Sequence, residues 1–149
     1  MFWPLLNWLT SRVLQRRSAS EDVPQHLHRG RLGEDAARHH LSRQGLKFLV
    51  SNFAGRRGEI DLIFRDRDCL VFVEVKTRSS ETWARPAAAV GRRKQRRLSR
   101  TALDYLRLLG HPKARFRFDI VEVLLEDGVV CEIRHLPNAF PLACRNYYS

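Results

Sequence analysis

Cysteine is scarce in this sequence, and its three copies stand far apart. Cys69, Cys131 and Cys144 form no CxxC pair and have no histidine beside them at a zinc-binding spacing. An odd, scattered set of this kind argues against a disulfide framework and against a structural zinc site. The pattern is typical of a reducing compartment, so we expect a cytoplasmic protein.

Long apolar runs are also absent, since no stretch reaches the roughly 18 apolar residues of a membrane-spanning helix. Near the N-terminus, apolar and aromatic residues recur at about helical spacing over residues 2–14, followed by Arg16 and Arg17. A signal peptide has the opposite order, with its charges first. The segment is predicted to be an amphipathic helix that packs on its own domain, docks on a partner or contacts a membrane surface. Disorder is the remaining alternative.

Acidic residues are outnumbered, with 16 Asp and Glu against 27 Lys and Arg, which gives a formal net charge of +11. A charge of this sign and size attracts polyanions without regard to their sequence. Nucleic acid, with DNA favoured, is therefore the leading candidate partner. The alternative is a basic surface without a specific partner.

The length and composition favour one folded domain. The chain has 149 residues, of which 44% are hydrophobic and 29% are charged, enough to bury one sizeable core. Residues 18–29 are polar and contain Pro24, which indicates a linker. We expect an N-terminal amphipathic helix and linker over residues 1–29 and a single domain over residues 30–149.

The spacing of apolar residues in that domain predicts a helix, three strands, a second helix and two further strands. The helices are expected at residues 32–44 and 92–109, and the strands at residues 46–50, 60–64, 70–77, 115–125 and 129–136. This order predicts an α/β fold with a mixed central β-sheet of about five strands flanked by helices.

A pair of carboxylates is predicted where the second and third strands meet. If residues 66–69 form a four-residue loop, Arg65 faces Leu70, and the same register places Asp61 opposite Glu74. Two facing carboxylates repel each other, so a sheet chosen only for stability would avoid them. A hard divalent cation such as Mg²⁺, bound through one or two carboxylates, fits this arrangement.

The same register places Glu59 opposite Lys76, with all four side chains on one face of the sheet. The simple alternative is a strand that shows alternating polar residues to solvent. However, Val71, Val73 and Val75 occupy the other face, which favours a central strand that is covered on both sides. A Glu and a Lys buried there need partners or a function.

Four motifs together resemble a nuclease signature: LGEDAARHHL at residues 32–41, GEIDLI at 58–63, VFVEVKTR at 71–78 and KQRRL at 94–98. The second and third motifs resemble the PD-(D/E)xK signature of archaeal Holliday junction resolvases. All four together look more closely like the YraN family of small bacterial proteins. The resemblance covers roughly residues 31–123, with Ile60 in place of the proline that gives the signature its name.

This resemblance implies a restriction-endonuclease-like core that uses Mg²⁺ or Mn²⁺. It implies that Asp61 and Glu74 are metal ligands, that the backbone carbonyl of Val75 completes the metal site and that Lys76 is the catalytic lysine. Glu34 matches an additional acidic residue of the resolvase-like group. Whether the protein forms a homodimer, as resolvase-like enzymes do, is left open.

A dense basic cluster is predicted at the start of the second helix, and a phosphate backbone would relieve its self-repulsion. The alternative is a solvated helix face. The candidate nucleic-acid-binding residues are Arg92, Arg93, Lys94, Gln95, Arg96 and Arg97, together with Arg56, Arg57 and Arg78 near the carboxylates. The sequence thus predicts a Mg²⁺-dependent endonuclease acting on DNA, branched or flapped structures included. The alternative is a non-catalytic nucleic-acid-binding module with the same fold.

Overall fold

The computed structural model describes residues 24–80 and 90–144, so the helix expected near the N-terminus lies outside the described residues. The described residues form two helices and five strands. In chain order these are α2 (Gln25–Arg43), β1 (Lys47–Ala54), β2 (Glu59–Asp66), β3 (Cys69–Arg78), α3 (Arg92–Leu108), β4 (Arg115–Glu126) and β5 (Val129–Phe140). None of the described helices is long and apolar enough to cross a membrane.

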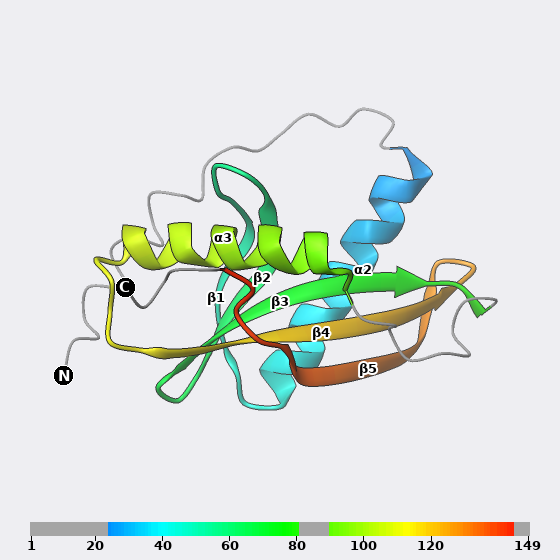
Figure 1. Ribbon diagram of the computed structural model, residues 1–149. Coiled ribbons are helices and arrows are strands. Elements are labelled where there is room, and N and C mark those ends of the chain that lie inside the picture. Colours follow the sequence, from blue (N-terminus) through cyan, green and yellow to red (C-terminus); the bar gives the residue numbers. More distant parts are fainter. Residues whose placement is uncertain (1–23, 81–89, 145–149) are drawn as a thin grey trace.

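The five strands form one sheet in the order β1-β2-β3-β4-β5. Neighbours run antiparallel except β3 and β4, which are parallel and are joined by the crossover that contains α3. Figure 1 shows α3 lying across one face of the sheet and α2 crossing the other. The predicted α/β fold with a mixed five-stranded sheet flanked by helices is therefore confirmed.

Strand β3 lies at the centre of the sheet and is covered on both faces. Leu70 and Phe72 belong to the apolar cluster under α3, whereas Val71 and Val73 belong to the cluster under α2. All four are at most 1% exposed. A strand buried on both sides is held rigidly, so polar residues that follow on it are fixed in position.

Helix α3 divides into an apolar and a basic face. Leu98, Ala102 and Tyr105 are buried against the sheet, and the Tyr105 ring lies 5.0 Å from the ring of Phe53 and 5.9 Å from that of Phe72, centre to centre. The opposite face carries exposed arginines. The helix therefore presents its positive charge to solvent while its other side seals the core.

The turn between β1 and β2 packs tightly against the middle of α3. The Gly55 N–H donates to the Gly58 carbonyl at 2.8 Å and closes the turn. A Cβ on Gly55 would lie 3.0 Å from side-chain atoms of Thr101 and Asp104, and one on Gly58 would lie 3.1 Å from Thr101 Oγ1. The two glycines thus let the start of β2 approach α3 closely.

Helix α2 is longer than expected. It begins at Gln25 rather than at residue 32, so the linker expected over residues 18–29 is helical from Gln25 onward. Pro24 stands just before the helix, where its missing N–H and fixed φ are tolerated, and nothing after it breaks the helix. Further along, Gly33 faces Thr77 so closely that a Cβ there would collide with the threonine side chain. This contact fixes α2 against the end of β3.

A buried ionic network ties β4 to β5. Asp119 is 1% exposed; Arg117 Nε donates to it at 3.0 Å, the Asn138 N–H donates at 2.9 Å and His135 Nε2 lies 2.8 Å away. Burial opposes ionisation of Asp119, but the bonds to His135, Arg117 and Asn138 outweigh it and lower its pKa. These contacts give Asp119 a structural role.

Candidate metal centre beside a basic helix

The β2–β3 register is the predicted one over the part of the ladder that forms. The pairs run from Asp66 with Cys69 to Leu62 with Val73, and Arg65 faces Leu70. Asp61 and Glu74 are the next residues beyond the last pair. The two strands therefore bring the carboxylates of Asp61 and Glu74 close together, although the backbones of these two residues do not pair.

Past that point the structure departs from the extrapolated register. The Asp61 carboxylate accepts a hydrogen bond from the Val75 N–H, with Oδ2 2.7 Å from the nitrogen. A side chain of β2 thus satisfies a β3 amide that a longer ladder would have paired with backbone. The predicted pairing of Glu59 with Lys76 is wrong, because the β2–β3 ladder ends at Leu62 and Val73.

The surroundings of Asp61 disfavour the charged form of its carboxylate. Burial is the largest cause of its pKa shift, and the charge of Glu74 adds to it; together they raise the pKa of Asp61 to about 7. The hydrogen bond from the Val75 N–H works in the other direction. Asp61 is therefore poised between its protonated and ionised forms at neutral pH, and a cation beside it would favour the ionised form.

Glu74 is buried, at 8% exposed, and its two carboxylate oxygens differ. Lys94 of α3 places its Nζ 2.9 Å from Oε1. Oε2 is buried and has no hydrogen-bond partner among the described residues. The counter-charge of Glu74 is thus supplied by α3, and one oxygen of Glu74 is left without a hydrogen-bond partner.

Another buried carboxylate, Glu122, lies on β4, one strand away from Glu74, and was not singled out from the sequence. Glu122 is 1% exposed and stands beside Lys76 in the β3–β4 register. Arg78 Nε lies 3.7 Å from its Oε1, and Arg134 Nη1 lies 3.9 Å from its Oε2. A signal for it was present, since Glu122 is the only charged residue in the apolar run IVEVLL at residues 120–125.

Glu34 lies near Asp61 and belongs to α2, which covers the face of the sheet opposite α3 (Figure 1). With the Asn52 amide turned so that its nitrogen faces the carboxylates, it donates to Glu59 Oε1 at 3.0 Å and to Glu34 Oε2 at 3.2 Å. Burial raises the pKa of Glu34, partly offset by the bond from Asn52, and the Glu34 charge in turn acts on Asp61. The charges of Glu34 on α2 and of Glu74 on β3 therefore both act on Asp61 of β2.

The donor set fits a hard divalent cation that shares its ligands with solvent and substrate. Asp61 and Glu74 offer two carboxylates, and the unpartnered Oε2 of Glu74 is the kind of oxygen that such an ion takes up. Mg²⁺ is commonly bound through only one or two carboxylates, with waters and phosphate oxygens completing the shell. Among residues 24–80 and 90–144 there is no group of three or more His, Cys, Asp or Glu that could hold a metal, so a closed structural site is not formed there.

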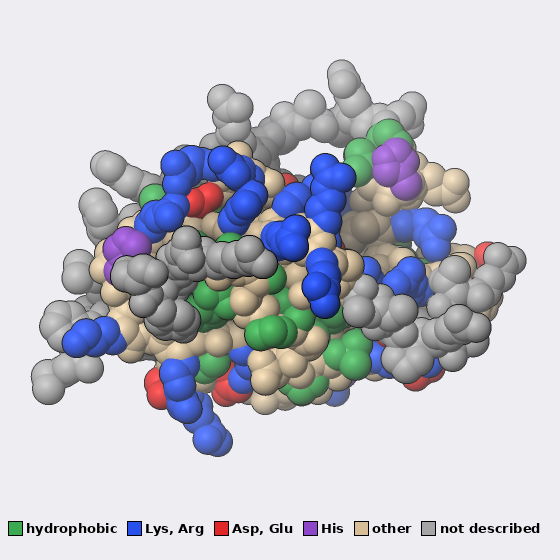
Figure 2. All heavy atoms as spheres, viewed as in Figure 1, with side chains coloured by type: hydrophobic (Ala, Val, Ile, Leu, Met, Phe, Trp, Pro, Cys, Tyr) green, Lys and Arg blue, Asp and Glu red, His purple; other side chains and the backbone are tan. Residues whose placement is uncertain are grey.

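The basic residues expected to contact nucleic acid lie mostly along α3. Figure 2 shows Lys and Arg side chains gathered over this helix. Arg92, Arg93, Arg96 and Arg97 are exposed. Lys94 reaches into the acidic pair, and the Gln95 side chain donates to the Val90 carbonyl at 2.7 Å and so secures the start of the helix.

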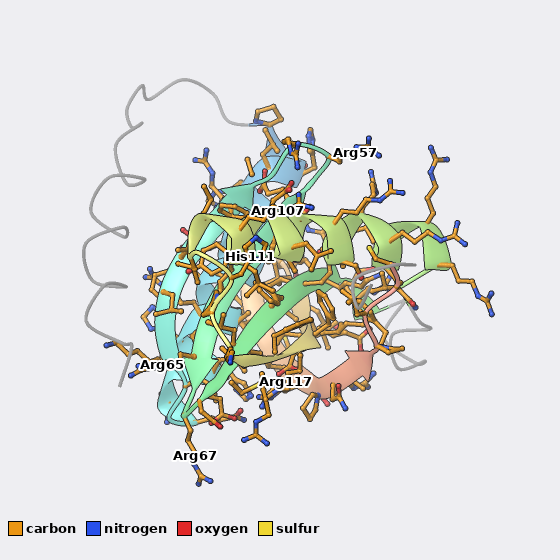
Figure 3. The ribbon with its side chains drawn as sticks, turned by 60° about the vertical axis from the view of Figure 1, so that its left-hand side comes forward. Arg57, Arg65, Arg67, Arg107, His111 and Arg117 are labelled. Carbon is orange, nitrogen blue, oxygen red and sulfur yellow. The ribbon has the colours of Figure 1, made fainter. Side chains whose placement is uncertain are left out.

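The remaining predicted contacts are more dispersed. Arg56 is tied to α3, because its N–H and its guanidinium both bond the Asp104 carboxylate, at 3.0 and 3.3 Å. Arg57 projects from the same turn beside α3, whereas Arg65 and Arg67 lie at the opposite end of β2 (Figure 3). Arg78 faces Glu122. The turn arginines thus extend the basic surface of α3.

The described residues define a class of α/β protein: a mixed five-stranded sheet between two helices, with a buried carboxylate pair at the edge of a basic helix. The chain belongs to the uncharacterised protein family UPF0102, whose family model matches residues 33–123. That span contains Glu34, Asp61, Glu74, Lys76 and Lys94. The expected membership of the YraN-like family is confirmed.

Individual relatives agree with this assignment. The chain is 44% identical over 115 residues to the UPF0102 protein of Trichlorobacter lovleyi, and the matched region covers 76% of this chain and 91% of the relative. It is 43% identical over 122 residues to the UPF0102 protein of Syntrophus aciditrophicus, covering 81% and 94% of the two chains. The similarity therefore spans nearly the whole length of both relatives.

Replacing Asp61 by Asn should stabilise the protein in a pH-dependent way. The folded-state pKa of Asp61, about 7, exceeds the ordinary value of 3.8, so the native state holds this proton more tightly and loses stability as pH rises from about 4 to about 7. At about pH 8, Asp61→Asn should raise the free energy of unfolding by roughly 1 to 3 kcal/mol, and the gain should vanish near pH 4. Denaturant unfolding at both pH values measures this, with Asp127→Asn in an exposed turn as the control. A variant less stable than wild type at pH 8 would show that Asp61 is retained for stability.

Proposed function

We propose that this protein is a divalent-metal-dependent phosphodiesterase with a restriction-endonuclease-like core that acts on DNA. The observation that carries the proposal is the buried pair of Asp61 and Glu74, one with a pKa raised to about 7 and the other with an unpartnered oxygen. Such groups reduce stability, and they stand next to a helix that presents exposed arginines. Acid groups with perturbed pKa values beside a polyanion-binding surface are typical of a phosphate-processing site.

In this proposal each residue has a separate task. Asp61 and Glu74 would hold Mg²⁺ or Mn²⁺, with the Val75 carbonyl as a further ligand and Glu34 as an outer acidic group. When bound, such an ion would supply Lewis-acid polarisation of the phosphate and lower the pKa of a water molecule. Lys76, two residues after Glu74 on the rigid central strand, would orient the attacking water and stabilise the charge that builds up on the phosphate.

The basic surface positions the substrate. Arg92, Arg93, Arg96 and Arg97 are exposed on α3, one end of which contacts Glu74 through Lys94. Contacts from such residues to phosphates fix the register of a nucleic acid and do not read its bases. This favours recognition of DNA by its backbone and shape, in keeping with branched or flapped substrates.

Cleavage is the direct test of this function. Purified protein with Mg²⁺ or Mn²⁺ should cut at least one substrate in a panel of linear, nicked, branched and flapped DNA and RNA. Asp61→Ala and Lys76→Ala should each lower the rate by about 100-fold or more, because each removes a group that acts on the reacting phosphate. Asp127→Ala and Lys113→Ala, which remove the same charges from exposed positions, serve as controls. No cleavage of any substrate would refute the catalytic part of the proposal.

A second candidate function is that of a non-catalytic nucleic-acid-binding module with the same fold. The observation that favours it is that Lys94 already neutralises Glu74, so the carboxylate has a partner without metal. Such a module would bind DNA in a salt-dependent way but would show no saturable binding of Mn²⁺ at Asp61 and Glu74. Metal titration therefore separates the two candidates.

Both candidates make the same prediction for the helix. The double variant Arg93→Gln/Arg97→Gln should weaken DNA binding and should reduce the slope of log affinity against log salt by about 0.9 for each lost phosphate contact. Fluorescence anisotropy of a labelled duplex across a salt series measures this slope. Arg43→Gln/Arg67→Gln removes the same charge away from α3 and should leave the slope nearly unchanged. Equal effects of the two double variants would mean that α3 is not the binding surface.

A further inference from the structure

Lys94 belongs to two groups of residues at once. It lies in the first turn of α3 among the exposed arginines at 92, 93 and 96, which form the proposed phosphate-binding surface. Its Nζ is also 2.9 Å from Glu74 Oε1. The Lys94 side chain is 39% exposed and that of Glu74 is 9% exposed, so the ion pair lies where the buried acidic pair meets solvent.

The position of Lys94 brings it into competition with a metal ion. A divalent cation held by Asp61 and Glu74 needs the negative charge that Lys94 now neutralises, and two cations at one carboxylate repel each other. Conversely, removing the ammonium leaves two close carboxylates with a buried unpartnered oxygen, an arrangement that strongly favours binding of a cation. The free energy of metal binding therefore depends on where Lys94 is.

A nucleic-acid phosphate is the group that can draw Lys94 away. A lysine is a compact charge on a flexible four-carbon stem, and its ammonium binds phosphate as readily as carboxylate. The neighbouring backbone need not move, since Gln95 ties the helix start to the Val90 carbonyl and the apolar face of α3 is buried in the core. Rotation of one side chain is enough to exchange its partner.

We propose that Lys94 is an exchangeable counter-ion that makes metal binding depend on nucleic acid. In the free protein Lys94 holds Glu74, and a bound phosphate backbone takes up Lys94 and opens Glu74 to the divalent ion. This inference rests on the proposed metal-dependent function of the same site. Because coupling between two ligands is reciprocal, the divalent ion must tighten nucleic-acid binding by the same factor.

The first test measures Mn²⁺ affinity by electron paramagnetic resonance of the free ion at about pH 8, where protons compete little with the metal for carboxylates. Without nucleic acid, Lys94→Gln should bind Mn²⁺ roughly 10-fold more tightly than wild type, within the usual range of coupling between sites. The matched control Arg93→Gln removes the same charge from the same helix turn and should leave Mn²⁺ affinity close to that of wild type. Lys94→Met, which keeps an unbranched and uncharged stem in place of the lysine, is the second variant should the first fail to fold.

The second test follows DNA affinity by fluorescence anisotropy with and without Ca²⁺, a hard cation with the same preference for oxygen ligands. In wild type, Ca²⁺ should tighten DNA binding. In both Lys94 variants this effect should be smaller, because only direct contact between the ion and a phosphate remains to couple the two ligands, and overall DNA affinity should fall slightly. Metal binding in wild type that neither DNA nor loss of Lys94 alters would overturn the inference and leave the metal site standing. No binding of Mn²⁺ by wild type, alone or with DNA, would overturn the proposed metal site and the inference with it.

Discussion

The burial of two carboxylates, Asp61 and Glu74, just beyond the last β2–β3 pair is the constraint around which this side of the molecule is arranged. Removing charge from water is costly unless partners compensate, and here compensation is incomplete. The Val75 N–H serves Asp61 and Lys94 serves one oxygen of Glu74. The raised pKa of Asp61 and the unpartnered oxygen of Glu74 remain uncompensated, and the proposed divalent cation would compensate both.

The fold holds these groups in place through packing on both faces of the sheet. Strand β3 is central and apolar on each side up to Val73, so Glu74 and Lys76 continue a strand that cannot shift. Close contacts then bring the two helices in: Gly33 against Thr77 on one face, and the Gly55–Gly58 turn against α3 on the other. A bulkier residue at these glycines would separate the acidic pair from the elements that surround it.

The strands and the β2–β3 register could be predicted from the sequence, because both depend on residues that are close together in the chain. Alternation of apolar residues predicts the strands, and counting around the turn at residues 66–69 predicts the register up to Leu62 and Val73. Two features depend on tertiary placement instead. The approach of Lys94 to Glu74 requires knowing how α3 lies across the sheet, and the end of the β2–β3 ladder follows from the Asp61 side chain taking the Val75 N–H. Glu122 could have been singled out as the only charged residue of the apolar run at residues 120–125, but its place beside Lys76 depends on the parallel pairing of β3 with β4.

The most direct measurement of the proposed metal site is a crystal structure of the protein with a short DNA duplex and Mn²⁺, using the anomalous signal of the metal. If Asp61 and Glu74 hold the metal, a peak is expected within coordination distance of both carboxylates, with the Lys94 ammonium on a phosphate. Saturating Mn²⁺ that leaves no peak between these carboxylates, with Lys94 still on Glu74, would contradict both the metal site and the exchange of Lys94.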